Sequence, residues 1–325
     1  MPPHVTVIVL SWNNATDTLA CLDSLAAVEY PDYRVLVVDN GSEDGSPDQI
    51  RDAWPEIELL ETGANLGYAG GNNAGIRRAL AQGADYVCLL NNDLTVAPDF
   101  LGELVRTAES DPQAGLLGPK VYRRESPDRL QSAGMAPRRA GQWELRGLGE
   151  LDEGQYDSLA YTDVLSGCAL FVGRGTLERI GLLDERFYLY DEDLDWCLCA
   201  LEAGYRNRFV PGARVYHRSA DPDDGGEARR VYYISRNRHL LYRKHRFGAC
   251  AYCLLYVQHA YWLSRWTFGP DWRAKRAERD ALLLAVRDGL LGRFGQGALG
   301  APDGFAPTVV AAGGLVYEKG SGDGF

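Results

Sequence analysis

A chain of 325 residues can hold one large α/β domain, or one domain and an appendage. Its hydrophobic content of 46% and charged content of 24% are those of an ordinary globular protein. The net charge of -11 excludes general affinity for nucleic acids, because backbone phosphates would be repelled. The start of the chain lacks the basic residues and cleavage site of a signal peptide, and its seven cysteines are an odd number. We therefore expect a cytoplasmic protein with reduced thiols.

The first 120 residues alternate between apolar runs and amphipathic stretches. Strands are predicted at Val5–Leu10, Tyr33–Asp39, Ile57–Thr62, Tyr86–Leu90 and Ala114–Val121. Helices are predicted between them at Thr16–Ala27, Ser46–Ala53, Ala69–Gln82 and Pro98–Ser110. This alternation indicates an α/β fold with a mostly parallel sheet and helices on both faces. Such sheets bind ligands at the carboxyl ends of their strands, so we expect the chemistry there.

The second half of the chain begins with a polar stretch over residues 123–160, interpreted as an insertion or hairpin that borders an acceptor site. Regular elements are then predicted as a strand at Val164–Val172, a helix near Leu177, an acidic helix at Asp191–Ala203 and a strand at Arg208–Val215. After a linker at Asp221–Gly226 the pattern is helical to about Phe294. We expect a catalytic domain over 1–222, a helical region over 227–295 and a loosely attached Gly-rich tail over 296–325.

Two polar motifs in the first half could bind a ligand. Asp39 ends the second strand in Val37-Val-Asp-Asn-Gly-Ser42, where its carboxylate could accept a hydrogen bond from a nucleobase or a ribose, or could cap a turn. The stretch Asn65–Gly75 combines glycines, which allow close backbone approach, with asparagines at the start of a helix, where anions bind. Its glycine spacing is not that of the dinucleotide fingerprint. Ligand binding and purely local roles both stay open for these motifs.

Three further features carry acids or a possible metal ligand. Asp93 follows the fourth strand, and a carboxylate there can hold Mg²⁺ or Mn²⁺ against a diphosphate, although it could also cap the next helix. The segment Tyr190–Trp196 places four carboxylates within five residues, and one of them could be a general base. His217 follows the last predicted strand, where it is either a structural hydrogen-bonding residue or a ligand.

The C-terminal third contains a basic and an apolar stretch. Seven Lys and Arg residues lie between Arg229 and Arg246, most simply on a solvated helix face, with an anionic lipid surface or a lipid-pyrophosphate acceptor as alternatives. The apolar run Ala249–Phe268 is interrupted by polar residues, so we do not expect it to span a membrane. We expect it to pack on the domain or on a second copy of the chain as a homodimer, with peripheral contact to the inner face of the plasma membrane as the alternative.

Taken in order, these motifs resemble glycosyltransferase family 2, in particular its bacterial rhamnosyltransferase-like members. The likeness covers about residues 4–240 and rests on Val37–Ser46, Asn65–Gly75, Leu90–Asp93, Asp191–Trp196, Gly204–Tyr205, Val215–His217 and Tyr232–Asn237. The resemblance implies the GT-A fold, a Rossmann-like α/β domain, here followed by a C-terminal helical segment. It also implies an inverting glycosyltransferase that moves a sugar from a nucleoside-diphosphate donor to an acceptor hydroxyl during synthesis of a cell-surface polysaccharide or glycoconjugate.

The resemblance also implies roles for individual residues. Asp193 would be the catalytic base, with Glu192 beside it in the catalytic pair. Asp93 would bind Mn²⁺ or Mg²⁺ as the end of a DxD-like motif, and His217 would be a further metal or diphosphate ligand. The metal motif departs from the family pattern, because Asn91-Asn92-Asp93 stands in place of two aspartates. Nucleotide binding, with Asp39 at the nucleobase, is expected from Ser11, Asn13, Asp39, Asn65, Gly71, Asn72 and Asn92.

The substrates follow from the resemblance alone. A dTDP-linked donor, with rhamnose as the first choice of sugar, is expected before a UDP-linked one, and the acceptor is expected to be a carbohydrate or a lipid-linked molecule. One alternative is a sugar nucleotidyltransferase, but the loop Ser11–Thr16 lacks the basic residue that would hold a triphosphate. The other is a non-catalytic sugar-nucleotide-binding protein, against which the presence of Asp93 and Glu192-Asp193 argues.

Overall fold

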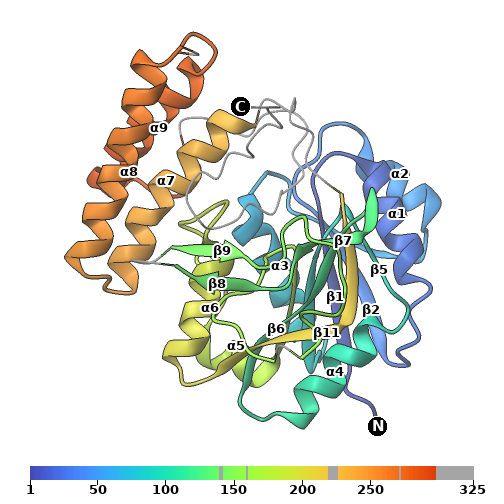
Figure 1. Ribbon diagram of the computed structural model, residues 1–325. Coiled ribbons are helices and arrows are strands. Elements are labelled where there is room, and N and C mark those ends of the chain that lie inside the picture. The colour runs from blue at the N-terminus through green and yellow to red at the C-terminus, as the bar shows by residue number, and fades with distance from the viewer. Residues whose placement is uncertain (139–141, 159, 219–225, 271, 298–325) are drawn as a thin grey trace.

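The computed structural model describes residues 1–138, 142–158, 160–218, 226–270 and 272–297 (Figure 1). Most of the predicted linker over 221–226 and of the predicted tail over 296–325 lies outside the described residues.

A mixed sheet of nine strands forms the centre of the described chain, in the order β3-β2-β1-β4-β10-β6-β11-β5, with β7 paired to β6. Its strands are β1 Val5–Ser11, β2 Tyr33–Asp39, β3 Glu58–Glu61, β4 Tyr86–Asn91, β5 Leu94–Val96, β6 Ala114–Arg123, β7 Ser126–Ser132, β10 Ala169–Gly173 and β11 Arg206–His217. Strands β1 to β4 run parallel to one another, and β6 runs parallel to β11. β10, β5 and β7 pair antiparallel.

Strand β1 shows why the sheet lies at the centre. All seven of its residues are buried, as expected for a parallel strand that is covered on both faces. Its register places Ser11 opposite Asp39 of β2, and Leu10 opposite Asn91 of β4. The polar motifs that follow these three strands therefore meet at one edge of the sheet.

Helices cover both faces of the sheet (Figure 1). Helices α1 Ala15–Leu25, α2 Ser46–Ala53 and α4 Phe100–Ser110 bury their apolar side chains in one core cluster. Helices α3 Gly67–Ala81, α5 Arg174–Ile180 and α6 Glu192–Glu202 bury theirs in the other, on the opposite face. The predicted α/β fold, a mostly parallel sheet with helices on both faces, is confirmed.

The polar stretch over 123–160, interpreted as an insertion or hairpin, contains β7 and a small two-stranded sheet of β8 Met135–Pro137 and β9 Trp143–Leu145, so it is organised into hairpins. One strand differs from its prediction. The strand predicted at Val164–Val172 begins only at Ala169. Before it, the amide of Gly167 donates to the Asp193 carboxylate instead of to a neighbouring strand, which explains the late start.

The C-terminal region consists of α7 Glu227–Lys244, α8 Ala249–Phe268 and α9 Arg276–Leu291. These helices stand beside the sheet domain (Figure 1), and their buried side chains belong to the same core cluster as those of α3 and α6. Within the described chain we find no helix whose length and hydropathy would let it cross a bilayer.

The prediction of a solvated basic face on α7 is wrong. Arg236 is fully buried and Arg238 is 5% exposed. Arg238 Nε lies 2.9 Å from Asp191 Oδ2, and Lys244 Nζ lies 2.7 Å from Asp195 Oδ2. Arg238 and Lys244 thus offset the charge of the acidic segment, because carboxylates taken out of water need an opposite charge nearby.

Candidate active site

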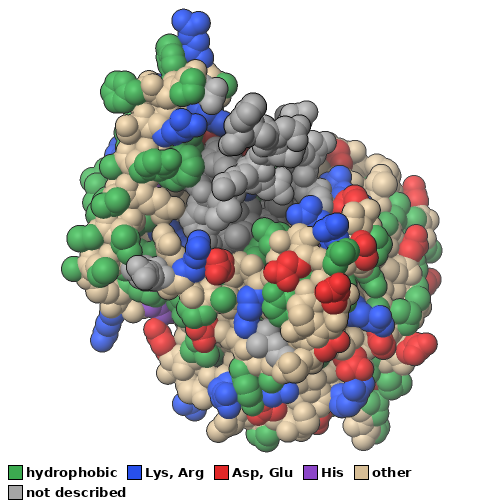
Figure 2. Space-filling view, viewed as in Figure 1, with side chains coloured by type: hydrophobic (Ala, Val, Ile, Leu, Met, Phe, Trp, Pro, Cys, Tyr) green, Lys and Arg blue, Asp and Glu red, His purple; other side chains and the backbone are tan. Residues whose placement is uncertain are grey.

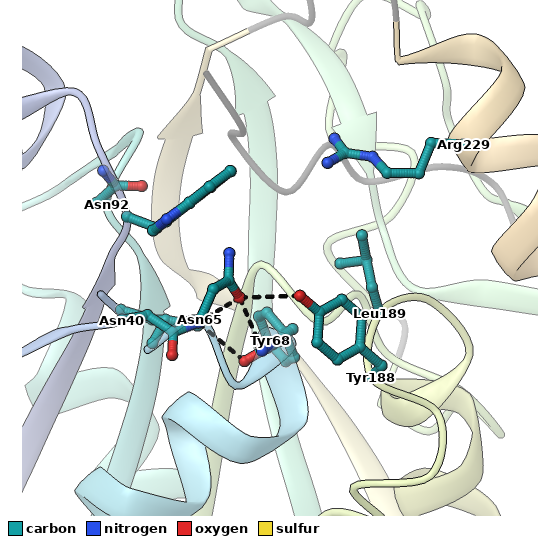
Figure 3. Close-up of a pocket in the computed structure, with 10 residues that line it drawn as sticks. Asn40, Asn65, Tyr68, Asn92, Tyr188, Leu189 and Arg229 are labelled. Atoms are coloured by element: carbon teal, nitrogen blue, oxygen red, sulfur yellow. Dashed lines mark hydrogen bonds between the residues drawn. The ribbon is translucent and has the colours of Figure 1, made fainter. Parts of the chain in front are cut away.

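A small cavity opens at the carboxyl edge of the parallel strands (Figure 3). It is lined from three directions: the ends of the first strands, the start of α3, and the segment before α6 together with α7. The lining residues are Leu10, Trp12, Asn40, Asn65, Gly67, Tyr68, Asn92, Tyr188, Leu189 and Arg229. This is the edge at which the sequence placed the chemistry.

One carboxylate oxygen of Asp39 stabilises the turn after β2, and the other is available to a ligand. Its Oδ2 accepts hydrogen bonds from the amides of Gly41 at 3.2 Å and Ser42 at 3.0 Å. Its Oδ1 is buried and has no hydrogen-bond partner among the described residues. A buried carboxylate oxygen without a donor is costly, so a ligand N–H or O–H at this point would be stabilising.

The loop after β1 is hydrogen-bonded to the loop after β2. Asn13 and Asn14 adopt left-handed backbone conformations with φ of 53° and 64°, which asparagine tolerates better than most residues. Asn13 Oδ1 accepts from the amide of Glu43 at 3.0 Å, and Ser11 Oγ lies 3.0 Å from Thr18 Oγ1. Ser11 and Asn13 therefore lie at the predicted edge but bond within the protein, and their contact with a nucleotide stays a prediction.

The Gly- and Asn-rich stretch shapes the floor of the cavity. Asn65 Oδ1 accepts from the amide of Gly67 at 2.9 Å and from the Tyr188 hydroxyl at 3.2 Å. A side chain at Gly71 would collide with Leu10 and Asn40, so this glycine lets α3 approach β1 closely. Asn72 is buried and donates to the Tyr68 carbonyl at 3.0 Å. Of these predicted positions only Asn65 lines the cavity.

Asp93 and His217 meet at the end of the sheet although they lie far apart in the chain. Their atoms Oδ1 and Nε2 are 3.1 Å apart, and both side chains are almost fully buried. Neither atom has a partner in hydrogen-bonding geometry, so the approach is a close contact and not a hydrogen bond. A carboxylate oxygen and an imidazole nitrogen that converge in this way fit a divalent cation.

The surroundings of this pair support the fit. His217 Nδ1 contacts the side-chain amide of Gln131 on β7, at 2.9 Å from Nε2 and 3.1 Å from Oε1. With Oε1 accepting from Nδ1–H, the lone pair of His217 Nε2 faces Asp93, the arrangement that usually supports a metal-bound histidine. Asn92 donates to Thr18 Oγ1 at 3.0 Å, which orients the motif that carries Asp93.

A second group of potential metal ligands lies outside the cavity. Ligand atoms of Asp195, Cys199 and His245 lie within 4.8 Å of one another. The ammonium of Lys244 is 2.7 Å from Asp195, and both ring nitrogens of His245 already contact carboxylates. We therefore interpret this group as an ion-pair network that joins α6 to α7.

The segment before α6 has an unusual backbone. Tyr188, Tyr190 and Asp191 have φ of 66°, 66° and 68°, a conformation that is costly for these residues. Asn237 of α7 holds the segment by donating from Nδ2 to the carbonyls of Phe187, Leu189 and Tyr190, at 3.0, 2.8 and 2.7 Å.

The predicted catalytic pair begins α6. Asp193 accepts from the amides of Gly167 and Leu194, each at 2.8 Å. Glu192 is 5% exposed, and within the described chain its Oε2 has no hydrogen-bond partner. Burial raises the pKa of both carboxyls, and the nearby Asp193 charge raises that of Glu192 further. Burial also raises the pKa of Asp191 to about 6, against the opposing effect of Arg238.

Three residues of this site had no specific role in the sequence-based account: Gln131, Asn237 and Arg229. Gln131 lay in the stretch that showed no clear periodicity, so no signal singled it out. Asn237 and its neighbour Arg236 were part of the family motif, and their signal was polar residues inside an otherwise apolar helix segment. Their contacts became visible only once α7 was placed against the acidic segment.

The chain is similar to a known protein family and to several glycosyltransferases. The model of the family described as glycosyl transferase family 2 matches residues 6–171. N-acetylglucosaminyl-diphospho-decaprenol L-rhamnosyltransferase of Mycobacterium tuberculosis is 30% identical over 247 residues, which are 68% of this chain and 78% of that protein. dTDP-rhamnosyl transferase RfbF of Shigella flexneri is 24% identical over 252 residues, 75% of this chain and 81% of the relative.

Among solved structures, mannosyltransferase PcManGT from Pyrobaculum calidifontis, in complex with GDP-Man and Mn²⁺, superposes with a TM-score of 0.57. The superposition covers 90% of this chain and 88% of that one at 20% sequence identity. This likeness shows the GT-A fold. The chain therefore belongs to glycosyl transferase family 2, and it is a rhamnosyltransferase-like glycosyltransferase with the GT-A fold.

Proposed function

We propose that this enzyme is an inverting glycosyltransferase that transfers rhamnose from a dTDP-linked donor to a hydroxyl of a lipid-linked or carbohydrate acceptor in glycan synthesis. The names of the two rhamnosyltransferase relatives support this choice of sugar, and the name of the mycobacterial one supports a lipid-linked acceptor. The observation that carries the proposal is the 3.1 Å contact of Asp93 with His217, at the sheet edge that also holds Asp39.

Asp93 and His217 would hold a divalent cation, Mn²⁺ or Mg²⁺, which supplies positive charge against the donor diphosphate. Asp39 Oδ1, which has no partner among the described residues, accepts the imide N–H of the nucleobase. Asp193 takes the proton of the acceptor hydroxyl, while the amides of Gly167 and Leu194 hold its carboxylate in place.

The group transfer balances without any further reagent. The acceptor oxygen forms a bond to the anomeric carbon on one face, and the bond from that carbon to the diphosphate oxygen breaks on the other. The proton ends on Asp193, and the electron pair leaves with the nucleoside diphosphate. One displacement of this kind inverts the anomeric configuration.

The test is release of nucleoside diphosphate from dTDP-, UDP- and GDP-linked sugars, measured with Mn²⁺, Mg²⁺ or EDTA. We expect release from one nucleotide class only, stimulated by metal and lost in Asp93→Asn. Asp99→Asn is the matched control, because Asp99 is exposed and pairs with Arg214. If no donor is turned over and calorimetry detects no nucleoside diphosphate binding, the proposed function is wrong.

The α8–α9 hairpin supports a related proposal, that the enzyme lies against an anionic membrane surface where a lipid-linked acceptor is found. Exposed apolar side chains gather on this hairpin (Figure 2), including Leu254, Val257, Tyr261 and Phe268 of α8. Exposed arginines at its tip, Arg265, Arg273 and Arg276, would contact lipid phosphates.

Co-sedimentation with phosphatidylglycerol vesicles tests this surface proposal. We expect binding at low salt that weakens in a Val257→Ser, Phe268→Ser variant. The membrane proposal is contradicted if the protein does not bind the vesicles. If it instead forms a dimer that the same substitutions dissociate, a second copy of the chain covers this surface.

A further inference from the structure

We infer that Arg229 is the side chain that recognises the diphosphate of the donor, so that the C-terminal helical region completes the donor site. This inference rests on the proposed function, because it assumes that the cavity takes a nucleotide sugar. The sequence grouped Arg229 with the basic residues up to Arg246, for which a lipid surface or a lipid-pyrophosphate acceptor was an alternative, and gave it no contact with the donor.

The position of Arg229 is the first observation. It belongs to the first turn of α7, yet it lines a cavity whose other walls come from strand ends and from the segments at Asn65 and Tyr188. Figure 3 shows its guanidinium extending across the cavity, toward the side on which Asn92 lies. Asn92 directly precedes Asp93 in the chain.

Charge is the second observation. Arg229 is the one residue with a formal charge among the described residues that line the cavity. The remaining lining groups are amides, aromatic rings, a glycine and aliphatic side chains, which do not offset the negative charge of a diphosphate. A planar guanidinium can bind two phosphate oxygens at once, which gives both charge and orientation.

The surroundings of Arg229 are the third observation. Its side chain is only partly exposed, and burial lowers its pKa, against the opposing effect of Tyr190, Tyr233 and Tyr188. The guanidinium is thus partly removed from water. A cation in such a place gains more from an incoming anion than one on the open surface, because its attraction is less screened.

The neighbouring residue provides a matched control. Arg230 lies on the same turn and pairs with Glu227, Nη2 to Oε1 at 2.8 Å, and it is not among the lining residues. Arg230→Gln therefore removes the same charge from the same helix while leaving the cavity lining intact.

Calorimetry on the full chain with Mn²⁺ tests the inference, with dTDP and UDP as ligands and thymidine and uridine as the matching nucleosides. We expect Arg229→Gln to weaken binding of the preferred nucleoside diphosphate ten- to a hundredfold, the range expected for charged hydrogen bonds. Binding of thymidine or uridine should change less than about twofold, because these nucleosides carry no phosphate charge for the guanidinium to attract. Arg229→Lys should fall between wild type and Arg229→Gln, since a lysine keeps the charge but not the paired donors.

The other outcomes distinguish failure of this inference from failure of the proposed function. Equal diphosphate affinity in wild type and Arg229→Gln, both folded by circular dichroism, would overturn the inference and leave the proposed function standing. A similar loss of diphosphate affinity in Arg230→Gln would also overturn it. Farnesyl diphosphate, a mimic of a lipid-linked acceptor, is the last ligand: if Arg229→Gln weakens binding of this molecule alone, Arg229 contacts the acceptor and the inference is wrong. If wild type binds neither dTDP nor UDP, the proposed function fails and the inference with it.

Discussion

Asp193 is held in a way that suits a base but leaves little freedom to move. Both of its oxygens accept backbone amides, and the adjacent carboxyl of Glu192 is buried. A carboxylate fixed in this way can take a proton without first reorganising, and such preorganisation contributes to catalysis. Glu192 shares the site, but its buried position and raised pKa favour a neutral carboxyl.

We predict that Asp193→Asn lowers kcat by about 10²- to 10⁴-fold, the range for loss of a general base. Binding of the nucleoside diphosphate should change little, because the substitution acts on the acceptor. Steady-state kinetics with the preferred donor measure both effects. Glu202→Gln is the control on the same helix, since Glu202 is exposed and contacts His245. A kcat within threefold of wild type for Asp193→Asn would exclude Asp193 as the base.

At the scale of elements, α7 stabilises the strained segment before α6. Asn237 donates to three carbonyls of that segment, and its side chain is fully buried. Its removal would take this donor from the carbonyls of Leu189 and Tyr190, whereas the Phe187 carbonyl would keep Arg236 Nη2. The cost of an unsatisfied buried polar group is about 1–3 kcal/mol.

We predict that Asn237→Ala lowers the free energy of unfolding by about 1–3 kcal/mol and reduces transferase activity, because the segment positions Asp193. Asn237→Asp keeps the oxygen that accepts from Arg236 Nε and Nη2 but turns the other oxygen toward the three carbonyls, so it should also be destabilising at neutral pH. Denaturant unfolding measures both variants. If Asn237→Asp is as stable as wild type, donation from Nδ2 is not what holds the segment.

The three C-terminal helices also bury two histidines. His239 of α7 and His259 of α8 have ring centroids 6.1 Å apart. Burial lowers the pKa of each from 6.5 to about 4, with Arg243 adding to the effect on His239, and His239 adding to it on His259. The unfolded chain binds protons at these sites more readily than the folded one, so stability is full above pH 6.5 and is lost as pH falls toward 4.

We predict that the free energy of unfolding falls by about 5 kcal/mol more in wild type than in a His239→Gln, His259→Gln variant between pH 6.5 and 4, about half of it from each histidine. The comparison of slopes cancels the other groups that titrate in this range. Denaturant unfolding at a series of pH values measures it. Parallel curves for the two proteins would show that these histidines are not held neutral by the fold.

The strands and helices of the first half could be predicted because their patterns are local. Strand β2 was predicted at its observed bounds, Tyr33–Asp39, and the helix Ser46–Ala53 likewise. The late start of β10 at Ala169 could not be predicted, because it depends on a bond from Gly167 to Asp193 on another element. The prediction of a solvated face on α7 failed for the same reason, since Arg238 and Lys244 pair with Asp191 and Asp195 of the acidic segment.

At the scale of the whole molecule, the site is assembled from distant parts of the chain. Sequence spacing could place Asp39 and Asp93 at one edge, because each follows a predicted strand. It could not show that His217 Nε2 meets Asp93 Oδ1, or that Gln131 contacts the other ring nitrogen, because both contacts depend on how β11 and β7 lie in the sheet. The cavity also needs α7, which provides Arg229 from beyond the predicted catalytic domain.

The central claim is that Asp93 and His217 bind a divalent cation. Mn²⁺ titration followed by electron paramagnetic resonance, with the preferred nucleoside diphosphate present, tests it most directly. We predict that Asp93→Asn and His217→Gln each lose the bound Mn²⁺, whereas Cys199→Ser, in the network around Asp195, retains it. Unchanged Mn²⁺ binding in the first two variants, or its loss in Cys199→Ser alone, would contradict the claim and place the cation elsewhere.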